Sequence, residues 1–286
     1  MIIDALLDSL IDSVKLLPFL FITYLLMEYL EEKMNSKTRS ILHQSGKTGP
    51  LWGAVLGMLP QCGFSAAASN LYAGRMITMG TVLAIYLSTS DEMLPILISE
   101  AVSPLLIVKI LVIKVIVGVI TGFIVDYFME RVMKKKEQEV DIHHFCEHEH
   151  CHCGHGILKP AVRHSLQILG FIFLVSAVLN LVIGFVGTEA LSNFILNKPV
   201  IGELLVGIIG LIPNCAASVV ITQLYLEGAI RFGTMIAGLL VGAGVGVLVL
   251  FRVNGEKKEN FTIVGILYVV GVCVGMMINL IGQIQV

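Results

Sequence analysis

Two stretches of the chain, 153 residues apart, repeat one another. GMLPQCGFSAAASNLYAGRMITMGT begins at Gly57, and GLIPNCAASVVITQLYLEGAIRFGT begins at Gly210. Eleven of thirty-one aligned positions are identical, and both copies place a proline, an amide, a cysteine and a serine inside an apolar run. Paired interruptions of hydrophobic segments are typical of transporters, where they mark the substrate site. The repeat predicts a duplicated membrane protein with one helix-breaking polar motif in each half.

The composition supports this prediction, because 56% hydrophobic residues and a mean hydropathy of +0.88 leave too little polar surface for a soluble globule. A membrane span needs about 20 apolar residues. Stretches of that order lie near 9–30, 51–73, 77–98, 104–128, 164–187, 203–226, 231–251 and 262–284. We expect an all-α integral membrane protein with a first membrane repeat at 1–130, a linker at 131–162 and a second repeat at 163–286. The acidic start does not resemble a secretory signal peptide, so the first span is expected to stay.

Basic residues fall in three loops, after the first span, in the centre and before the last span, which the positive-inside rule places in the cytoplasm. A full crossing by 51–73 would put the first two of these loops on opposite sides of the membrane. If 51–73 is instead a re-entrant pair of half-helices broken at Pro60 and Gln61, every basic loop is inside. An odd number of crossings then inverts the second half.

The same reading makes 203–226 a hairpin that enters from outside, with both termini outside the cell membrane. Two inverted hairpins would meet where irregular backbone lines a polar cavity. A fully spanning 51–73 remains the alternative, because proline kinks also occur in ordinary transmembrane helices.

Each hairpin motif contributes candidate substrate ligands. We expect Gln61, Cys62 and Ser65 to face their counterparts in the second half, which are Asn214, Cys215 and Ser218. A helix break frees backbone carbonyls and exposes a half-helix N-terminus, so it supplies ligands of its own. Cysteine is also a common small residue in packed helices, and for either cysteine alone packing is the better interpretation. The duplication favours a functional site.

A second polar group, STSDE, lies within the expected span 77–98 and has no acidic counterpart in the second half. Asp91 and Glu92, with Ser90 before them, are candidate ligands, because intramembrane charges mark ion paths or proton relays. The alternative is a span that ends at Ser90 and leaves both carboxylates in an outer loop. Lys114, near mid-depth in the next span, is a plausible partner for Asp91 or Glu92, and the three residues form a candidate coupling group.

The central loop carries the sequence HHFCEHEHCHCGH. Imidazole and thiolate ligands suit zinc, copper, nickel or cobalt. The spacing is not that of a zinc finger, so we predict a flexible cytoplasmic metal-collecting tract that is accessory to transport. Its candidate ligands are His143, His144, Cys146, His148, His150, Cys151, His152, Cys153 and His155.

With LPQCGFS, STSDE, IPNCAASVV and the His/Cys-rich loop, the chain resembles a bacterial and archaeal family described as heavy-metal exporters with ten transmembrane segments. Some members are labelled arsenic efflux proteins and others manganese transporters. The resemblance extends over essentially the whole length and implies export of a metal or metalloid. Ten segments agree with the eight apolar stretches if each broken hairpin counts as two.

The sequence and the resemblance together predict a secondary transporter that exports a divalent transition metal. Manganese is favoured by the oxygen ligands and by the family label, whereas the paired cysteines suit softer ions. No GxxxxGK[ST] motif is present, so the energy must come from ion gradients or from a partner, and exchange of the metal against protons is expected. The alternatives are efflux of trivalent arsenicals held by Cys62 and Cys215, or a metal channel. We expect no enzyme activity, no bound cofactor besides the transported metal and no nucleic-acid partner. A homo-oligomer is compatible with the sequence.

Overall fold

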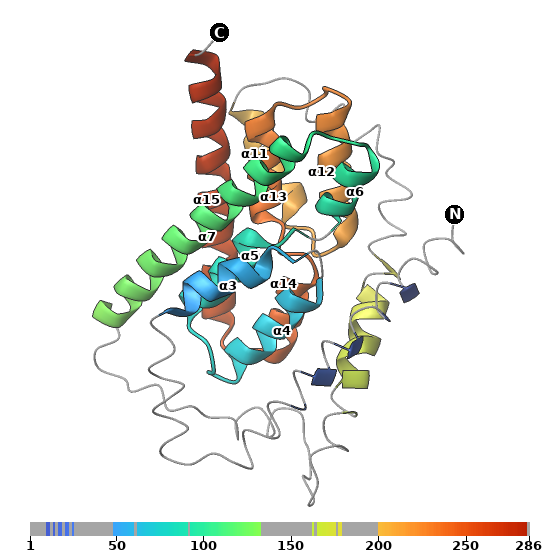
Figure 1. Cartoon of the computed structure of the whole chain (residues 1–286). Coiled ribbons are helices and arrows are strands. Elements are labelled where there is room, and N and C mark those ends of the chain that lie inside the picture. The colour runs from blue at the N-terminus through green and yellow to red at the C-terminus, as the bar shows by residue number, and fades with distance from the viewer. Residues whose placement is uncertain are drawn as a thin grey trace, which may run out of the picture.

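The computed structural model describes residues 48–59, 62–90, 92–132, 165–175 and 200–284, together with isolated positions between 10 and 25 and at 162, 177 and 178. Every regular element in this part is a helix, which confirms the expected all-α fold (Figure 1). The elements are α3 (Gly49–Gly57), α4 (Cys62–Ala73), α5 (Met79–Ser88), α6 (Met93–Ser99), α7 (Pro104–Val132), α11 (Ile201–Gly210), α12 (Cys215–Leu226), α13 (Phe232–Val241), α14 (Val245–Val253) and α15 (Lys257–Ile284).

Four helical segments are long and apolar enough to cross a membrane: Met79–Ser99, Pro104–Arg131, Phe232–Val253 and Lys257–Gly282. They correspond to four of the expected spans. The expected span 164–187 contains a described apolar helix at Ser165–Val175. Most of the expected span 9–30 lies outside the described residues. A multi-pass membrane protein follows from the length and hydropathy of these segments.

The two motif-bearing stretches are each divided into two short helices, as the sequence predicts. Helices α3 and α4 have 9 and 12 residues, and α11 and α12 have 10 and 12. At 1.5 Å per residue, none of them reaches the roughly 30 Å of a bilayer core.

Contacts at the ends of these pairs show that the chain turns back. A Cβ atom added at Gly49, where α3 begins, would collide with Thr81 at the start of α5. In the second half, Glu203 in the first turn of α11 accepts a hydrogen bond of 3.2 Å from Thr234 at the start of α13. The chain therefore leaves along the first short helix and returns along the second. Each pair is a hairpin.

Two further interruptions were not predicted. The expected span 77–98 is divided into α5 and α6, with Thr89 and Ser90 outside the helices, and 231–251 is divided into α13 and α14. No break is expected from the glycine-rich stretch 238–246. The structure places Gly242–Gly244 between two helices, with the φ angle of Gly244 at +54° in the region that favours glycine.

The internal repeat of the sequence recurs in three dimensions. Adding 153 to the end residues of α4 and α5 gives the end residues of α12 and α13. Close glycine contacts also recur at this offset: Gly57 approaches the backbone of Ile85 as Gly210 approaches Gly238, Gly80 approaches Gly122 as Gly233 approaches Gly275, and Gly118 approaches Ala84 as Gly271 approaches Ala237. In the first half α3, α5 and α7 pack against one another, and in the second half α11, α13 and α15 do the same.

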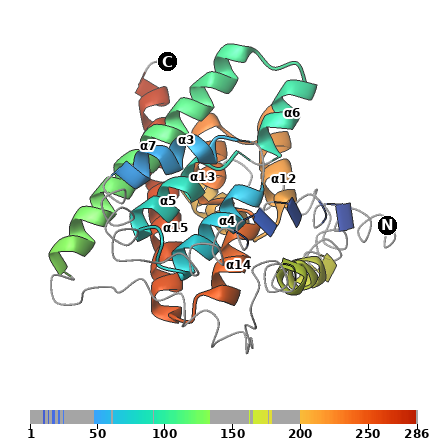
Figure 2. The ribbon, with the colours of Figure 1, turned by 60° about the horizontal axis from the view of Figure 1, so that its bottom comes forward.

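The two halves interlock rather than lie side by side. Helix α4 of the first half packs against α14 of the second, and α12 of the second packs against α6 of the first. Helices α7 and α15 run in roughly opposite directions, and both views show this arrangement (Figures 1 and 2). Helices α5 and α13 form the centre: all of α5 and nearly all of α13 are buried. A helix that is apolar all round is expected in such a core.

Candidate functional site

The candidate site is built from the four helix breaks that flank α5 and α13. Within the first half, the Ser90 hydroxyl donates a 2.7 Å hydrogen bond to the carbonyl of Met58, which connects the α5–α6 break with the α3–α4 break. Across the halves, Ser69 and Tyr86 donate hydrogen bonds of 2.7 and 3.1 Å to the carbonyl of Gly246 at the start of α14. One hydrogen bond thus connects the two breaks of the first half, and two others connect α4 and α5 to the start of α14.

The C-terminal end of α5 is capped by its own hydroxyl groups. Ser88 donates to the carbonyls of Ala84 and Ile85 at 2.8 and 3.0 Å, and Thr89 donates to Ile85 at 2.8 Å. All three hydroxyl residues of the break, including Ser90, are at most 3% exposed. The last carbonyls of a helix carry the negative end of its dipole, so the end of α5 favours a cation.

The C-terminal end of α13 is instead capped by a cation from the other half. Lys114 of α7 is 1% exposed, and its Nζ donates a 2.6 Å hydrogen bond to the carbonyl of Leu239. In a longer helix that carbonyl would accept from residue 243, but α13 ends at Val241. An ammonium group at this position compensates both the free carbonyl and the helix dipole.

The two central helix ends therefore differ in charge although they occupy repeated positions. The position equivalent to Lys114 in the second half is Leu267, which is buried in the core. Helix α5 ends without a protein cation among its described contacts and is followed by the acidic pair Asp91 and Glu92. The site thus combines a fixed positive charge at α13 with a negative electrostatic environment at α5.

The second-half motif is packed around the start of α12. Asn214 is the N-cap residue, and its side chain accepts from the backbone N–H of Ala216 at 3.3 Å. Cys215 is buried, and the Ser218 hydroxyl donates to the carbonyl of Cys215 at 2.8 Å. This amide, thiol and hydroxyl lie within one helical turn at the α11–α12 break.

Only some of the first-half candidates can be placed. Ser65 is fully buried in α4, and its Cβ lies against Gly246, where an added Cβ would be 2.7 Å away. Glu92 lies at the N-cap position of α6 and gives it no side-chain hydrogen bond. Gln61, Asp91 and the His/Cys loop at 143–155 lie outside the described residues, as does the side chain of Cys62.

The structure brings together some of the predicted residues and not others. Ser90 reaches the first hairpin, and Ser65 reaches the second half, but the contact partner of Ser65 is α14 rather than α12. Lys114 donates to a carbonyl of α13, and Asp91, one of its two expected partners, lies outside the described residues, so the expected pairing stays a prediction. Among the described residues, no group of three or more histidine, cysteine, aspartate or glutamate side chains is arranged to hold a metal ion.

Two residues of the site were missed by sequence analysis. Ser69 and Tyr86 share a hydrogen bond of 2.6 Å, and both contact α14. In the sequence, Ser69 is only a small residue and Tyr86 only an aromatic residue of an apolar helix. A signal was present, because Ser69 lies one turn after Ser65 and its hydroxyl also donates to the Ser65 carbonyl at 2.8 Å. The motif thus continues along one face of α4.

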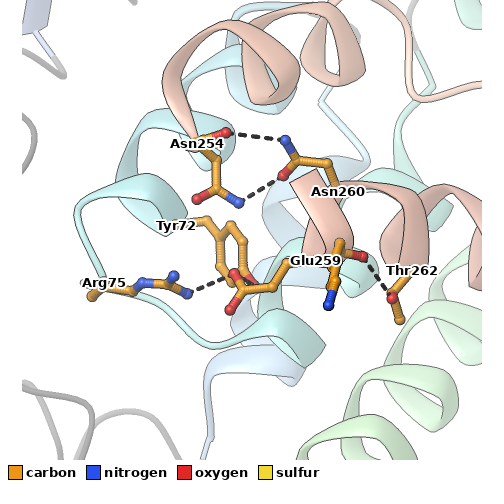
Figure 3. A network of polar contacts seen from close by, with 7 residues as sticks. Tyr72, Arg75, Asn254, Glu259, Asn260 and Thr262 are labelled. Atoms are coloured by element: carbon orange, nitrogen blue, oxygen red, sulfur yellow. Dashed lines mark hydrogen bonds and ion pairs between the residues drawn. The ribbon is translucent and has the colours of Figure 1, made fainter. Parts of the chain in front are cut away.

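A polar network joins the two halves at the far end of α4 (Figure 3). The carboxylate of Glu259 in α15 accepts hydrogen bonds of 2.8 Å from both Tyr72 and Arg75. Partial burial opposes the charge of Arg75, but the neighbouring Glu259 carboxylate raises the pKa of its guanidinium above the usual value. Beside this network, the side chains of Asn254 and Asn260 are hydrogen-bonded to each other at 2.6 Å.

The family comparison identifies the kind of protein that carries this site. The sequence profile of the ArsP_2 family, described as "Putative, 10TM heavy-metal exporter", matches residues 1–201. The chain belongs to this family. Ten-segment exporters of this family are transporters rather than enzymes, and their description agrees with the apolar helices found here. The match ends where α11 begins, so it is shorter than the whole-length resemblance expected from the motifs. Comparisons with curated proteins and with solved structures gave no match.

Proposed function

We propose that this heavy-metal exporter is a secondary transporter for a divalent transition metal, with manganese as the favoured substrate, and that the metal passes through the four helix breaks. The observation that carries the proposal is the charge difference between the two central helix ends. The end of α13 is occupied by the Lys114 ammonium, whereas the end of α5 presents buried hydroxyls next to an acidic pair. The second end is the one suited to a metal cation.

The ligand set favours a hard or borderline ion. Ser90 and the backbone carbonyls at the breaks provide oxygen, as would the carboxylates of Asp91 and Glu92 and the amides of Gln61 and Asn214. Oxygen ligands suit manganese, whereas Cys62 and Cys215 would increase affinity for softer ions. Movement of the metal onto the carboxylates would weaken their attraction to Lys114, which couples metal binding to a charge inside the protein.

The contacts between distant loops support an inverted arrangement of the two halves. Arg75 and Glu259 form an ion pair of 2.8 Å, so they lie at the same end of the molecule. Two residues on the same side of the membrane must be separated by an even number of crossings. Five expected apolar stretches lie between Arg75 and Glu259, so one of them cannot cross. The fold-back of α11 and α12 removes one crossing. With the basic loops in the cytoplasm, both termini lie on the outer side of the cell membrane and the His/Cys loop lies on the cytoplasmic side.

The same geometry supports re-entrant hairpins over a fully spanning 51–73. Both hairpins return to the end from which they start, and their breaks contact the breaks of the neighbouring spans. Half-helices that meet in this way let irregular backbone lie at membrane depth without exposure to lipid. We place the accessory metal-collecting tract at 143–155 on the cytoplasmic side, where it would supply metal for export. Its deletion should leave most of the membrane activity intact.

A flux assay distinguishes the proposed function from arsenical efflux and from a metal channel. Manganese, zinc, cobalt or arsenite is added outside inverted vesicles that do or do not contain the protein, under a proton gradient. The proposal expects saturable, gradient-dependent uptake of manganese that persists in Cys62→Ser and Cys215→Ser. Arsenite uptake that is lost in both variants would favour arsenical efflux instead. Large, non-saturating currents would favour a channel, and no flux of any ion would contradict the proposal.

A further inference from the structure

A buried carboxylate lies apart from the four breaks and was not among the sequence candidates. Glu203, in the first turn of α11, is 3% exposed. Its Oε1 accepts hydrogen bonds from the Thr234 hydroxyl and from the side-chain amide of Asn279. Its Oε2 is buried and has no hydrogen-bond partner among the described residues. Burying a carboxylate that has no hydrogen-bond partner on one oxygen is costly.

The first half contains a matched carboxylate in a different electrostatic environment. Asp126 occupies the position equivalent to Asn279, and its Oδ1 accepts from the backbone N–H of Gly80 at 2.8 Å. Its Oδ2 accepts from Thr78 at 2.7 Å. Both oxygens of Asp126 are therefore hydrogen-bonded, one of them to a backbone N–H at a helix N-terminus.

In the second half, the corresponding helix N-terminus does not reach the carboxylate. The backbone N–H of Gly233 donates to the Asn279 side-chain oxygen at 2.9 Å. The side-chain N–H of Asn279 in turn donates to Glu203. Glu203 thus accepts two neutral donors on one oxygen and none on the other. The amide at position 279 separates the carboxylate from the helix dipole.

The neighbouring charged and titratable groups do not compensate Glu203. Helix α13 begins after Arg231, α12 is followed by Glu227, and α15 contributes Tyr268, whose hydroxyl donates to the Leu204 carbonyl at 3.1 Å. Tyr225 of α12 stacks with Phe232. Across the residues placed in the structure, no basic side chain forms an ion pair with Glu203.

We propose that Glu203 is a proton-binding site through which the exporter couples metal efflux to proton entry. This inference rests on the proposed function. Thr234 lies about 12 Å along α13 from its broken end, at 1.5 Å per residue. In the topology above, Glu203 is on the outer side, so it meets protons from outside before they reach the breaks. An intramembrane carboxylate that alternates between protonated and ionised forms is a proton carrier.

Infrared spectroscopy of the purified protein in lipid tests the protonation state without transport. The wild type should show a protonated carboxyl band that titrates with pH, that is absent from Glu203→Gln and that persists in the matched control Asp126→Asn. That control is conservative because the second half naturally has asparagine at this position. A band unchanged by Glu203→Gln, or no protonated carboxyl band in the wild type, would overturn the proton site.

Flux measurements then test coupling. Glu203→Gln should reduce uphill transport driven by a pH gradient at least tenfold and keep metal–metal exchange, whereas Asp126→Asn should keep both. If Glu203→Gln fails to fold, Thr234→Val serves instead: it removes one donor from the ionised form and should move the pH midpoint of transport upward. Unchanged pH dependence in both variants would refute the coupling role. A lost infrared band in a protein that carries no metal would refute the proposed function and leave the proton site standing.

Discussion

At the scale of single residues, Lys114 determines how the two repeated halves differ. Its ammonium is buried and reaches from the first half to a carbonyl at the broken end of α13. A buried charge is tolerated only with strong partners. Here a helix end provides one of them, and the same position in the second half is an apolar leucine. One difference between the copies thus places a positive charge at one of the two equivalent helix ends.

Replacement of this lysine should impair both stability and transport. Lys114→Met removes a charged hydrogen bond to Leu239, worth about 2 kcal/mol, and leaves a buried carbonyl without that donor. We expect a lower unfolding temperature in detergent and at least a tenfold loss of metal flux, with an altered pH profile. Lys109→Met on the same helix is the control, because Lys109 is exposed and contacts only the face of Phe232 among its described partners. Unchanged flux and pH dependence in Lys114→Met would contradict the assigned role.

At the scale of elements, the sequence predicts the hairpin breaks and misses those in α5–α6 and α13–α14. The hairpin breaks contain proline and an amide, which interrupt a helix locally. The other breaks depend on distant partners: Lys114 is 125 residues from Leu239, and Ser90 is 32 residues from Met58. Local patterns contain no information about such contacts. For the same reason, Ser90 was predicted as a ligand but not as the connection between two breaks.

The repeated glycine contacts give a prediction at this scale. Gly122→Ala and Gly275→Ala each place a methyl group against the backbone of a neighbouring helix, at 2.7 and 2.5 Å. Overpacking of this kind costs about 1–3 kcal/mol, so both variants should unfold at lower temperature in a thermal shift assay. Gly265→Ala, in α15 with no neighbouring atom within 4 Å, should be neutral or slightly stabilising. Equal stability of all three variants would show that the repeated contacts are not close.

At the scale of the whole molecule, charge parity predicts two hairpins that fold back, and the contacts of Thr81 and Thr234 agree with that expectation. The exchange of α4 and α12 between the halves could not be predicted. Hydropathy identifies which segments are buried but not which half covers them. The interlocked arrangement brings one helix of each hairpin into contact with the other half, and such contacts would couple the halves during alternating access.

The orientation of the halves is tested by accessibility of single cysteines at 47, 134 and 198 to a membrane-impermeant reagent. Positions 47 and 134 should react from the cytoplasmic side, and position 198 should react from outside. These positions lie in expected loops, so their substitution should leave flux intact. Reaction of 47 and 134 from opposite faces would contradict the inverted arrangement.

The central claim is that the metal passes the helix breaks, and protection of Cys215 tests it most directly. A variant with Cys215 as its only cysteine would be treated during turnover with a small membrane-permeant thiol reagent, with and without manganese. We expect manganese to slow modification of Cys215 at concentrations that saturate flux. A variant with only the exposed Cys273 should react at the same rate in both conditions. A rate at Cys215 that is independent of manganese, in protein that still transports the ion, would contradict a pathway through the breaks.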